Sequence, residues 1–464
     1  MSVLRFNAFV MNTASHIQHG QWRHPEANQI HFNDVGFWID LARTLEAGLF
    51  DAMFFADVVG LYGPIGGSYE VNAREGLQIP SNDPSVLLSA LAVSTEHLGL
   101  AFTSSVLQEH PFNFARKVST LDHISKGRIA WNIVTSSLEN SARNFGLEQL
   151  TQHDERYEWA SEYLDVTYKL WEGSWDEGAL QIDRAGGVFS DHRKIHKIHH
   201  VGKRYKVEGP HLPSPSPQRT PVLYQAGSSA AGRRFAAANA EAQFIGAPNP
   251  AVAAELIADT RRLAVEAGRL PQDIQFFQGI SFVVGSTEEE ARRKEADHDA
   301  YASRDGFLAH MNFAVDRHGN PYPADTPLSS IKTNASQSIL EWLSKSAPGR
   351  EPTVADLGDL VGRRARIVGT PEQIADQLVA WQQAGVDGIN VVNWRLPGSY
   401  REFIDHVLPV LRARGLAQNA YRPGTLRQKL FGTDLLPARH PGARYRGAFG
   451  TSPLPAPTAA QALA

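Results

Sequence analysis

The 464-residue chain contains no cysteine, and this absence excludes several classes of chemistry. Without thiols, the protein has no disulfides, no thiolate metal sites, no iron–sulfur clusters and no cysteine nucleophile. The chain also lacks a basic excess, because its formal net charge is −4 at pH 7. Binding to a nucleic-acid backbone, which needs clustered cationic side chains, is therefore not expected.

Long hydrophobic runs are absent as well. No stretch approaches the roughly 20 apolar residues that span a bilayer. The apolar run after Arg5 ends at Asn12 and Thr13, which is too short for a secretory signal, so we expect a cytoplasmic protein. The chain exceeds the roughly 250–300 residues at which a single core stops growing, so it forms either two domains or one large barrel with insertions.

Apolar runs typical of buried strands alternate with helical patterns along the chain. Eight runs predict strands, beginning at Leu4, Asp51, Leu98, Arg128, Pro221, Ala242, Ile274 and Gly388. Helices are predicted at 34–46, 84–95, 113–124, 157–171, 233–239, 250–267, 287–301, 371–384 and 400–414. This alternation predicts a (β/α)8 TIM barrel. The alternative is an open doubly wound sheet, but no glycine-rich fingerprint follows the first strand.

Three irregular segments interrupt the alternation, at 58–83, 172–220 and 303–359. We predict that they are insertions in a single barrel domain spanning residues 1–432, and that 58–83 contains no regular element. Long ordered loops are usually functional. Residues 433–464 form a C-terminal tail, predicted to be partly disordered because the sequence from Gly450 is rich in Pro and Ala without periodicity.

Polar residues stand where the first four predicted strands end, and in a barrel these ends meet at one mouth. They are Asn12, Asp57, Thr103, Ser104, Asn132 and Thr135. Asn132 lies inside the apolar strand 127–135, where a polar amide needs a partner. It either satisfies nearby backbone groups or belongs to a binding site.

Two further groups suit an anion at the same mouth. Gly227, Ser228 and Ser229 follow the fifth strand and open a helix, so free N–H groups and small hydroxyls are available there for a phosphate. An ordinary serine N-cap is the alternative. His153 and Tyr157 stand one helical turn apart and can face the same point, although a lone helical histidine is more often structural.

No metal site is predicted. Histidines cluster within 16–24 and within 196–200, but neither group has a recognised ligand spacing, and the second lies among Arg and Lys residues. No Gly-x-Ser-x-Gly motif marks a serine nucleophile.

Several long motifs, in order, resemble the bacterial-luciferase-like flavin monooxygenases. The motifs occupy residues 7–12 (NAFVMN), 19–26 (HGQWRHPE), 55–60 (FADVVG), 131–136 (WNIVTS), 153–157 (HDERY) and 216–227 (SPQRTPVLYQAG). Within this superfamily the chain is similar to the group of nitrilotriacetate, dibenzothiophene-sulfone and long-chain alkane monooxygenases, most of all to the alkane enzyme. The resemblance runs from about residue 4 to Gly432.

The resemblance implies a (β/α)8 barrel that binds reduced FMN from a separate NAD(P)H-dependent flavin reductase. With O2 as co-substrate, such an enzyme oxygenates a C–H, C–S or C–N bond of a small organic substrate through a flavin peroxide. It also implies a homodimer or homotetramer. The alternatives are a non-catalytic flavin-binding protein, a flavin-degrading lyase of the same group, and a flavin-independent barrel hydrolase.

Site residues follow from the resemblance position by position. Those expected to contact the flavin are Asp57, Thr103, Asn132, His153, Tyr157, Ser228 and Ser229. Those expected on the substrate side, as donors or acceptors of protons, are His16, Tyr62, Gln78 and His310. His310 lies in the third insertion, which the family places over the mouth as a lid. Two positions depart from the alkane enzyme: Thr13 replaces a Cys and Ser137 replaces a His, which puts an alkane substrate in doubt.

Overall fold

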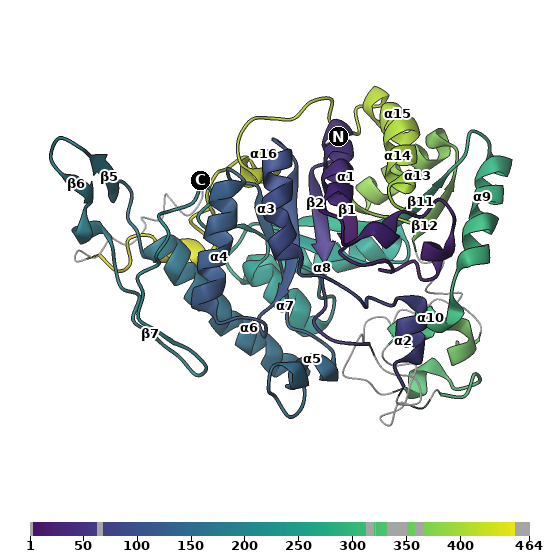
Figure 1. The fold of residues 1–464 in the computed structure, drawn as a ribbon, viewed down its shortest axis with the longest axis horizontal. Coiled ribbons are helices and arrows are strands. Elements are labelled where there is room, and N and C mark those ends of the chain that lie inside the picture. Colours follow the sequence, from purple (N-terminus) through teal and green to yellow (C-terminus); the bar gives the residue numbers. More distant parts are fainter. Residues whose placement is uncertain are drawn as a thin grey trace.

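A closed barrel of eight parallel strands forms the centre of the computed structural model, which describes residues 3–62, 68–311, 320, 322–331, 350–357 and 365–450 (Figure 1). The strands are β1 (Arg5–Met11), β2 (Ala52–Ala56), β3 (Gly99–Ser105), β4 (Ile129–Val134), β9 (Val222–Gln225), β10 (Ala242–Ile245), β11 (Gln275–Val284) and β13 (Gly388–Val392). They pair in chain order, and β13 returns to β1 through Ala8 opposite Val391. The predicted (β/α)8 barrel and all eight predicted strands are confirmed, and this closure excludes the open sheet.

Helices surround the barrel because each buries one apolar face against the outward-facing side chains of the strands. The principal ones are α1 (Val35–Ala47), α3 (Pro84–Ser94), α4 (Pro111–Ile124), α6 (His153–Tyr168), α7 (Ala230–Asn239), α8 (Pro250–Glu266), α9 (Glu288–Tyr301) and α13 (Pro371–Gln383). The predicted closing helix consists of α14 (Gly398–Glu402), a π-helical turn and α15 (Leu408–Ala413).

Three helices begin earlier than the sequence predicts. α4, α6 and α7 start at Pro111, His153 and Ala230 in place of residues 113, 157 and 233. α4 opens with a proline and α6 with a polar first turn, which the apolar period does not reveal, and α7 opens with Ala-Ala-Gly, where no large apolar side chain marks the start. At α7, Ser229 is the N-cap and accepts a hydrogen bond from the Gly232 N–H.

The amino-terminal end of the barrel is closed by a helix that the sequence did not indicate. α16 (Leu426–Phe431) places Leu426 and Leu430 against the interior side chains of the strands. On the same helix, Arg427 is fully buried and pairs with Glu241 at 2.7 Å. Its Nη1 and Nη2 atoms also donate to the backbone carbonyls of residues 218, 220 and 221.

The insertions contain more regular structure than expected. The prediction that 58–83 holds no element is wrong, because α2 (Glu70–Glu75) forms there and packs against α10 (Arg304–His310). An ion pair of 2.7 Å between Arg74 and Asp305 joins the two helices, a contact between segments far apart in the sequence. A ninth strand, β12 (Arg366–Gly369), also unpredicted, extends the sheet beyond the second half of β11.

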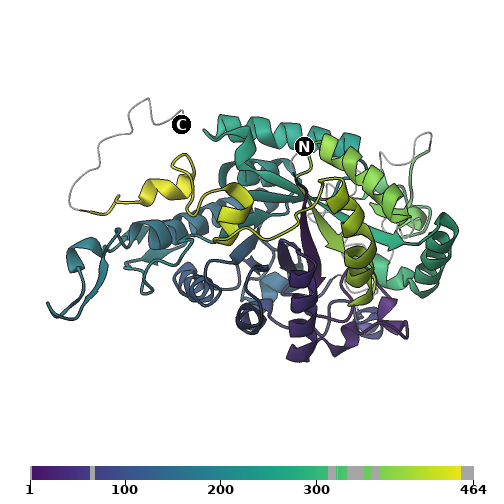
Figure 2. The ribbon, with the colours of Figure 1, turned by 90° about the horizontal axis from the view of Figure 1, so that it is seen from above.

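Residues 172–220 form two small antiparallel hairpins, β5 (Leu180–Asp183) with β6 (Val188–Ser190) and β7 (His200–Val201) with β8 (Lys206–Val207). Both extend from the barrel on one side (Figure 1). The C-terminal segment, in yellow, runs along the outer helices (Figure 2), and its 3-10 helix Pro441–Tyr445 contacts α6 and α7. The rest of the predicted tail, 451–464, lies outside the described residues, as does much of the 303–359 insertion. Among the described helices, none has the length and apolar character that crossing a membrane requires.

Candidate active site

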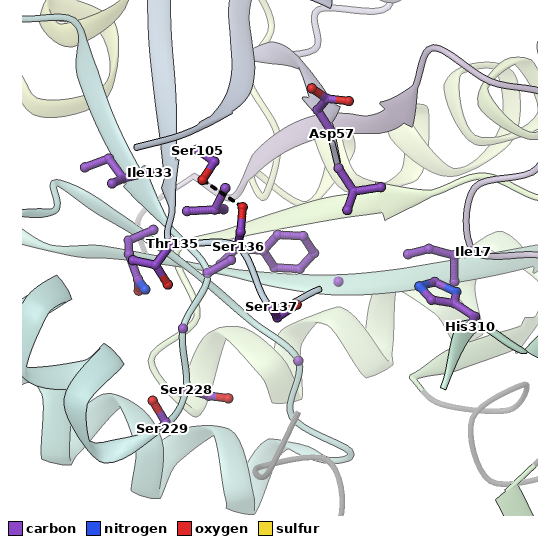
Figure 3. A pocket seen from close by; sticks show the side chains of 18 of the residues that line it. Ile17, Asp57, Ser105, Ile133, Thr135, Ser136, Ser137, Ser228, Ser229 and His310 are labelled. Carbon is purple, nitrogen blue, oxygen red and sulfur yellow. Dashed lines mark hydrogen bonds between the residues drawn. The ribbon is translucent and has the colours of Figure 1, made fainter. Parts of the chain in front are cut away.

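A cavity of about 550 Å³ opens at the carboxyl ends of the barrel strands. Strand-end loops and α10 surround it, so its lining comes from distant parts of the sequence, as expected for a TIM barrel. Figure 3 shows Ser228 and Ser229 on one side of this cavity and His310 with Ile17 on the other. Seven predicted site residues line it: Asp57, Tyr62, His153, Tyr157, Ser228, Ser229 and His310.

The end of the cavity near α7 is rich in hydrogen-bonding groups. The Ser229 hydroxyl lies 3.2 Å from Nε2 of His153 and also bonds to the Tyr157 hydroxyl. Burial raises the pKa of Tyr157, so this phenol stays protonated and can act as a donor. A Cβ on Gly227 would come within 2.5 Å of the Tyr157 hydroxyl oxygen. Glycine at this position therefore keeps the loop open beside the phenol.

Arg156, which the sequence did not single out, adds a buried cation to this end. Its Nη1 donates to the Ser136 carbonyl, and Ser136 has a left-handed backbone with φ 57°. The Ser136 hydroxyl donates to Ser105 at 2.8 Å, the contact dashed in Figure 3. The signal that could have identified Arg156 was its position inside the 153–157 motif, directly before Tyr157.

Thr103 and Asn132 lie beneath the cavity floor and not on its lining. Thr103 precedes the lining residue Ser105 by two positions on β3, and Asn132 precedes the lining residue Val134 by two positions on β4. Side chains two positions apart point to the same side of a strand, so Thr103 and Asn132 lie one layer deeper in the barrel. Asn132 Nδ2 donates to the Thr103 hydroxyl at 3.0 Å, and that hydroxyl donates to the Phe55 carbonyl at 2.9 Å. Within the described part of the chain, Oδ1 of Asn132 has no hydrogen-bond partner.

Asp57 is the carboxylate at the cavity wall. Burial, and next the charge of Asp83, raise its pKa to about 7. Hydrogen bonds from the Val58 N–H and the Gln108 side chain oppose this rise. Gln108, which was not predicted from the sequence, also accepts from Ser104 Oγ at 3.1 Å. Asp57 can therefore hold or release a proton near neutral pH.

The four residues predicted on the substrate side lie close together, but only two line the main cavity. Tyr62 and His310 pack edge to face with ring centroids 4.4 Å apart. Gln78 bonds to Tyr62 and donates from Nε2 to the His16 carbonyl at 2.9 Å. The His16 ring packs against Phe9 and lines a small adjacent hollow, which shares Ile17 with the main cavity.

Burial sets the protonation state of these residues. It lowers the pKa of His310 to about 4, and burial with the nearby His310 lowers the pKa of His16 to about 3. It raises the pKa of Tyr62 to about 12 despite the hydrogen bond from Gln78. At neutral pH both imidazoles and the phenol are therefore uncharged.

The two positions that depart from the alkane enzyme lie apart. Ser137 lines the main cavity, whereas Thr13 lines the small hollow and donates to the Pro80 carbonyl at 2.8 Å. The histidines that clustered in the sequence have different surroundings: His24 contacts Asp297 and His196 contacts Asp176, whereas His16 and His19 both lie close to His310.

Comparison with known proteins places this barrel in a family. The sequence pattern of the luciferase-like monooxygenases matches residues 11–388. The chain is 44% identical over 447 residues to the long-chain alkane monooxygenase of Geobacillus thermodenitrificans, covering 96% of this chain and 98% of that protein. It is 42% identical over 449 residues to the dimethyl-sulfide monooxygenase of Hyphomicrobium sulfonivorans, covering 96% and 94%.

A solved structure of a riboflavin lyase with modified FMN and riboflavin superposes with a TM-score of 0.90 at 36% identity, covering 96% of this chain and all of that one. The family match spans most of the chain, and both named relatives are monooxygenases. The chain therefore belongs to the luciferase-like monooxygenase family and is a flavin-dependent monooxygenase.

Proposed function

We propose that this protein is the oxygenase component of a two-component system. It binds reduced FMN delivered by a separate NAD(P)H-dependent flavin reductase and uses O2 to oxygenate a small organic substrate. Because the reductase draws on NAD(P)H, we place the system in the cytoplasm. The observation that carries the proposal is the arrangement of one cavity, with anion-binding groups at one end, an unpartnered amide oxygen under its floor and neutral histidines at the other end.

The α7 end of the cavity fits the FMN phosphate. Ser228 and Ser229 stand at the amino terminus of the ten-residue helix α7, where N–H groups and the helix dipole favour an anion. Tyr157 supplies a protonated hydroxyl, and Gly227 leaves space beside it. Arg156 contributes a positive charge. These residues would hold the phosphate in place.

The floor of the cavity fits a flavin ring. A buried amide oxygen without a partner costs free energy, and Oδ1 of Asn132 is such an atom in the described structure. A ring N–H group would supply the missing donor. Thr103 fixes the orientation of the amide through its hydroxyl, since it accepts from Nδ2.

Bound reduced flavin would supply the two electrons that O2 needs to insert one oxygen atom and release the other as water. The protein residues would exclude bulk water and manage protons. The apolar part of the cavity wall includes Ile17, Val58 and Phe307, which would help to exclude water. Asp57 can exchange a proton near neutral pH, and His310 can present a neutral imidazole.

The lining favours a neutral substrate of low polarity. Arg156 is the one Arg or Lys among the described lining residues, and it lies at the proposed phosphate end. An amino-polycarboxylate would leave its charges unpaired there, which is costly in a buried site. We therefore place the substrate among sulfides, sulfones and hydrocarbons. Because Ser137 replaces a histidine of the alkane enzyme, we favour a substrate other than a long-chain alkane.

A second candidate is breakdown of a flavin itself. It is favoured by the 36% identity and the TM-score of 0.90 to the riboflavin lyase, whose structure contains riboflavin as substrate.

Anaerobic titration with reduced FMN, followed by addition of O2, separates these readings. The proposal predicts one FMN bound per chain and, in the presence of reductase and NADH, an oxygenated product from a sulfide, sulfone or hydrocarbon. Consumption of added riboflavin would favour the lyase. Failure to bind reduced FMN, or binding without any product from the substrate panel, would contradict the proposal.

A further inference from the structure

His19 lies beneath the helix that brings His310 to the cavity. Its side chain is completely buried, and its ring packs edge to face against Phe307 with centroids 5.0 Å apart. Its carbonyl accepts from the Ser303 N–H at 3.0 Å, just before α10 begins. A Cβ on Gly306 would stand 2.9 Å from the His19 Cβ, so glycine permits this close approach.

Two hydrogen bonds connect His310 through His19 to Ser15. Nε2 of His19 lies 2.7 Å from Nδ1 of His310, although the residues are 291 positions apart. Nδ1 of His19 lies 3.0 Å from the Ser15 hydroxyl. With its Nδ1 occupied, His310 has only Nε2 left to interact with a molecule in the cavity it lines.

The direction of the two hydrogen bonds that connect Ser15, His19 and His310 follows from counting donors and acceptors. Burial lowers the pKa of His19 well below its usual value and that of His310 to about 4, so both rings are neutral and each carries one proton. A serine hydroxyl contributes one proton and needs an acceptor. In the described part of the chain, the acceptor bonded to the Ser15 hydroxyl is Nδ1 of His19.

If Ser15 donates to Nδ1 of His19, the proton of His19 must be on Nε2. That N–H then donates to Nδ1 of His310, which leaves the proton of His310 on its own Nε2. The reverse direction would make Ser15 an acceptor and leave its hydroxyl proton without a partner in a buried position, which is unfavourable.

We propose that His19 is a positioning residue, which holds His310 in the tautomer that presents an Nε2–H donor to the cavity. The tautomer follows from contacts within the chain, whereas its use in oxygen chemistry rests on the function proposed above. An N–H donor at this place would stabilise negative charge on a reacting oxygen and keep the proton from exchanging with bulk water.

Imidazole ¹⁵N–¹H correlation spectra of the flavin-free protein test the tautomer directly. His19→Phe and His310→Phe assign the signals, because each removes one ring. We expect the shared proton on Nε2 of His19, with a hydrogen-bonded unprotonated Nδ1 and a protonated Nε2 on His310. A proton on Nδ1 of His310 would overturn the proposal. Because flavin is absent, this result leaves the function proposed above untouched.

Oxygen coupling in variants tests the positioning role. His19→Phe keeps the ring shape without a donor, so we expect reduced FMN to bind within about twofold of wild type while hydrogen peroxide release rises severalfold. His19→Gln can return an amide N–H to the position of Nε2 and should restore most of the coupling. His298→Phe removes a buried histidine stacked on Trp394, away from the cavity, and serves as a control. If His19→Phe and His19→Gln both form as much product per O2 consumed as the wild type, the proposal is contradicted.

Discussion

The hydroxyl oxygen of Tyr157 lies 2.5 Å from the position that a Cβ would occupy on Gly227. Real Cβ atoms do not approach that closely, so a larger residue at 227 must shift the phenol, the Gln225 amide or the loop itself. The loop and the α6 side chain therefore depend on each other, although 70 residues of sequence separate them.

Gly227→Ala should weaken FMN binding by displacing the Tyr157 hydroxyl. We expect Gly227→Ala, Tyr157→Phe and Ser228→Ala each to cost roughly 1–3 kcal/mol, the range for a hydrogen bond to a charged group. Riboflavin, which lacks the phosphate, should bind almost unchanged. Gly398→Ala is a matched control because a Cβ there meets no atom within 4 Å. Anaerobic titration measures both affinities, and equal weakening for the two flavins would assign these residues to the ring or to folding.

His310→Ala should separate oxygen consumption from product formation. The variant keeps the whole proposed phosphate end, so reduced FMN should bind normally, but it lacks the imidazole that faces the cavity. We expect most of the product to be replaced by hydrogen peroxide, measured against O2 consumed. His406→Ala, at an exposed helical position, is the control. Wild-type coupling in His310→Ala would show that this histidine has no part in the chemistry.

The barrel was predictable from the sequence because its strands are buried on both faces and read as continuous apolar runs. The elements that were missed have no such run. α2 and α10 are short, largely polar helices that are stabilised by each other across distant sequence, as the Arg74–Asp305 pair shows. No local pattern reports a contact of that kind.

The site was less predictable: seven of the predicted site residues line the cavity, whereas their role in holding flavin stays a prediction. The hydrogen-bond chain from Ser15 through His19 to His310 was not, because His19 looked like one member of an N-terminal histidine cluster. Its role depends on which ring nitrogen faces which atom after folding. Gln108 and Arg156 were missed for the same reason, because Gln108 meets Asp57 and Arg156 meets Ser136 only in the folded protein.

Asp57 should make stability fall as pH rises toward neutrality. Its pKa is about 7 in the folded protein against 3.8 for the free group. Between these values the folded state holds a proton that the unfolded state has lost, so the free energy of unfolding decreases with rising pH. Asp57→Asn removes this dependence and should stabilise the protein above pH 7 by at most roughly 4 kcal/mol relative to wild type. Urea unfolding at pH 5 and pH 8 measures it, and an equal difference at both pH values would refute the assignment.

Arg427 should be essential for stability. Its charge is fully buried against Glu241, and removing one partner leaves the other uncompensated. We expect Arg427→Met to reduce the free energy of unfolding by roughly 3–5 kcal/mol. Arg262→Met removes an exposed arginine that pairs with Asp259 and Glu266, and should cost at most about 1 kcal/mol. Denaturant unfolding measures the free energy of unfolding of both variants. A similar decrease in both would show that the buried Arg427–Glu241 pair does not stabilise this end of the barrel.

In the proposed reaction, this cavity uses reduced FMN to place one atom of O2 into an organic molecule. Isotope labelling tests this reaction. The protein, a flavin reductase, NADH and FMN are incubated under ¹⁸O2 with a sulfide, a sulfone, an alkane or an amino-polycarboxylate. Mass spectrometry then measures the mass of each product. We predict one ¹⁸O atom in the product of a neutral substrate, only when FMN and reductase are both present, and its loss in Tyr157→Phe at limiting FMN. A product that carries no ¹⁸O, or that forms equally without flavin, would contradict the account.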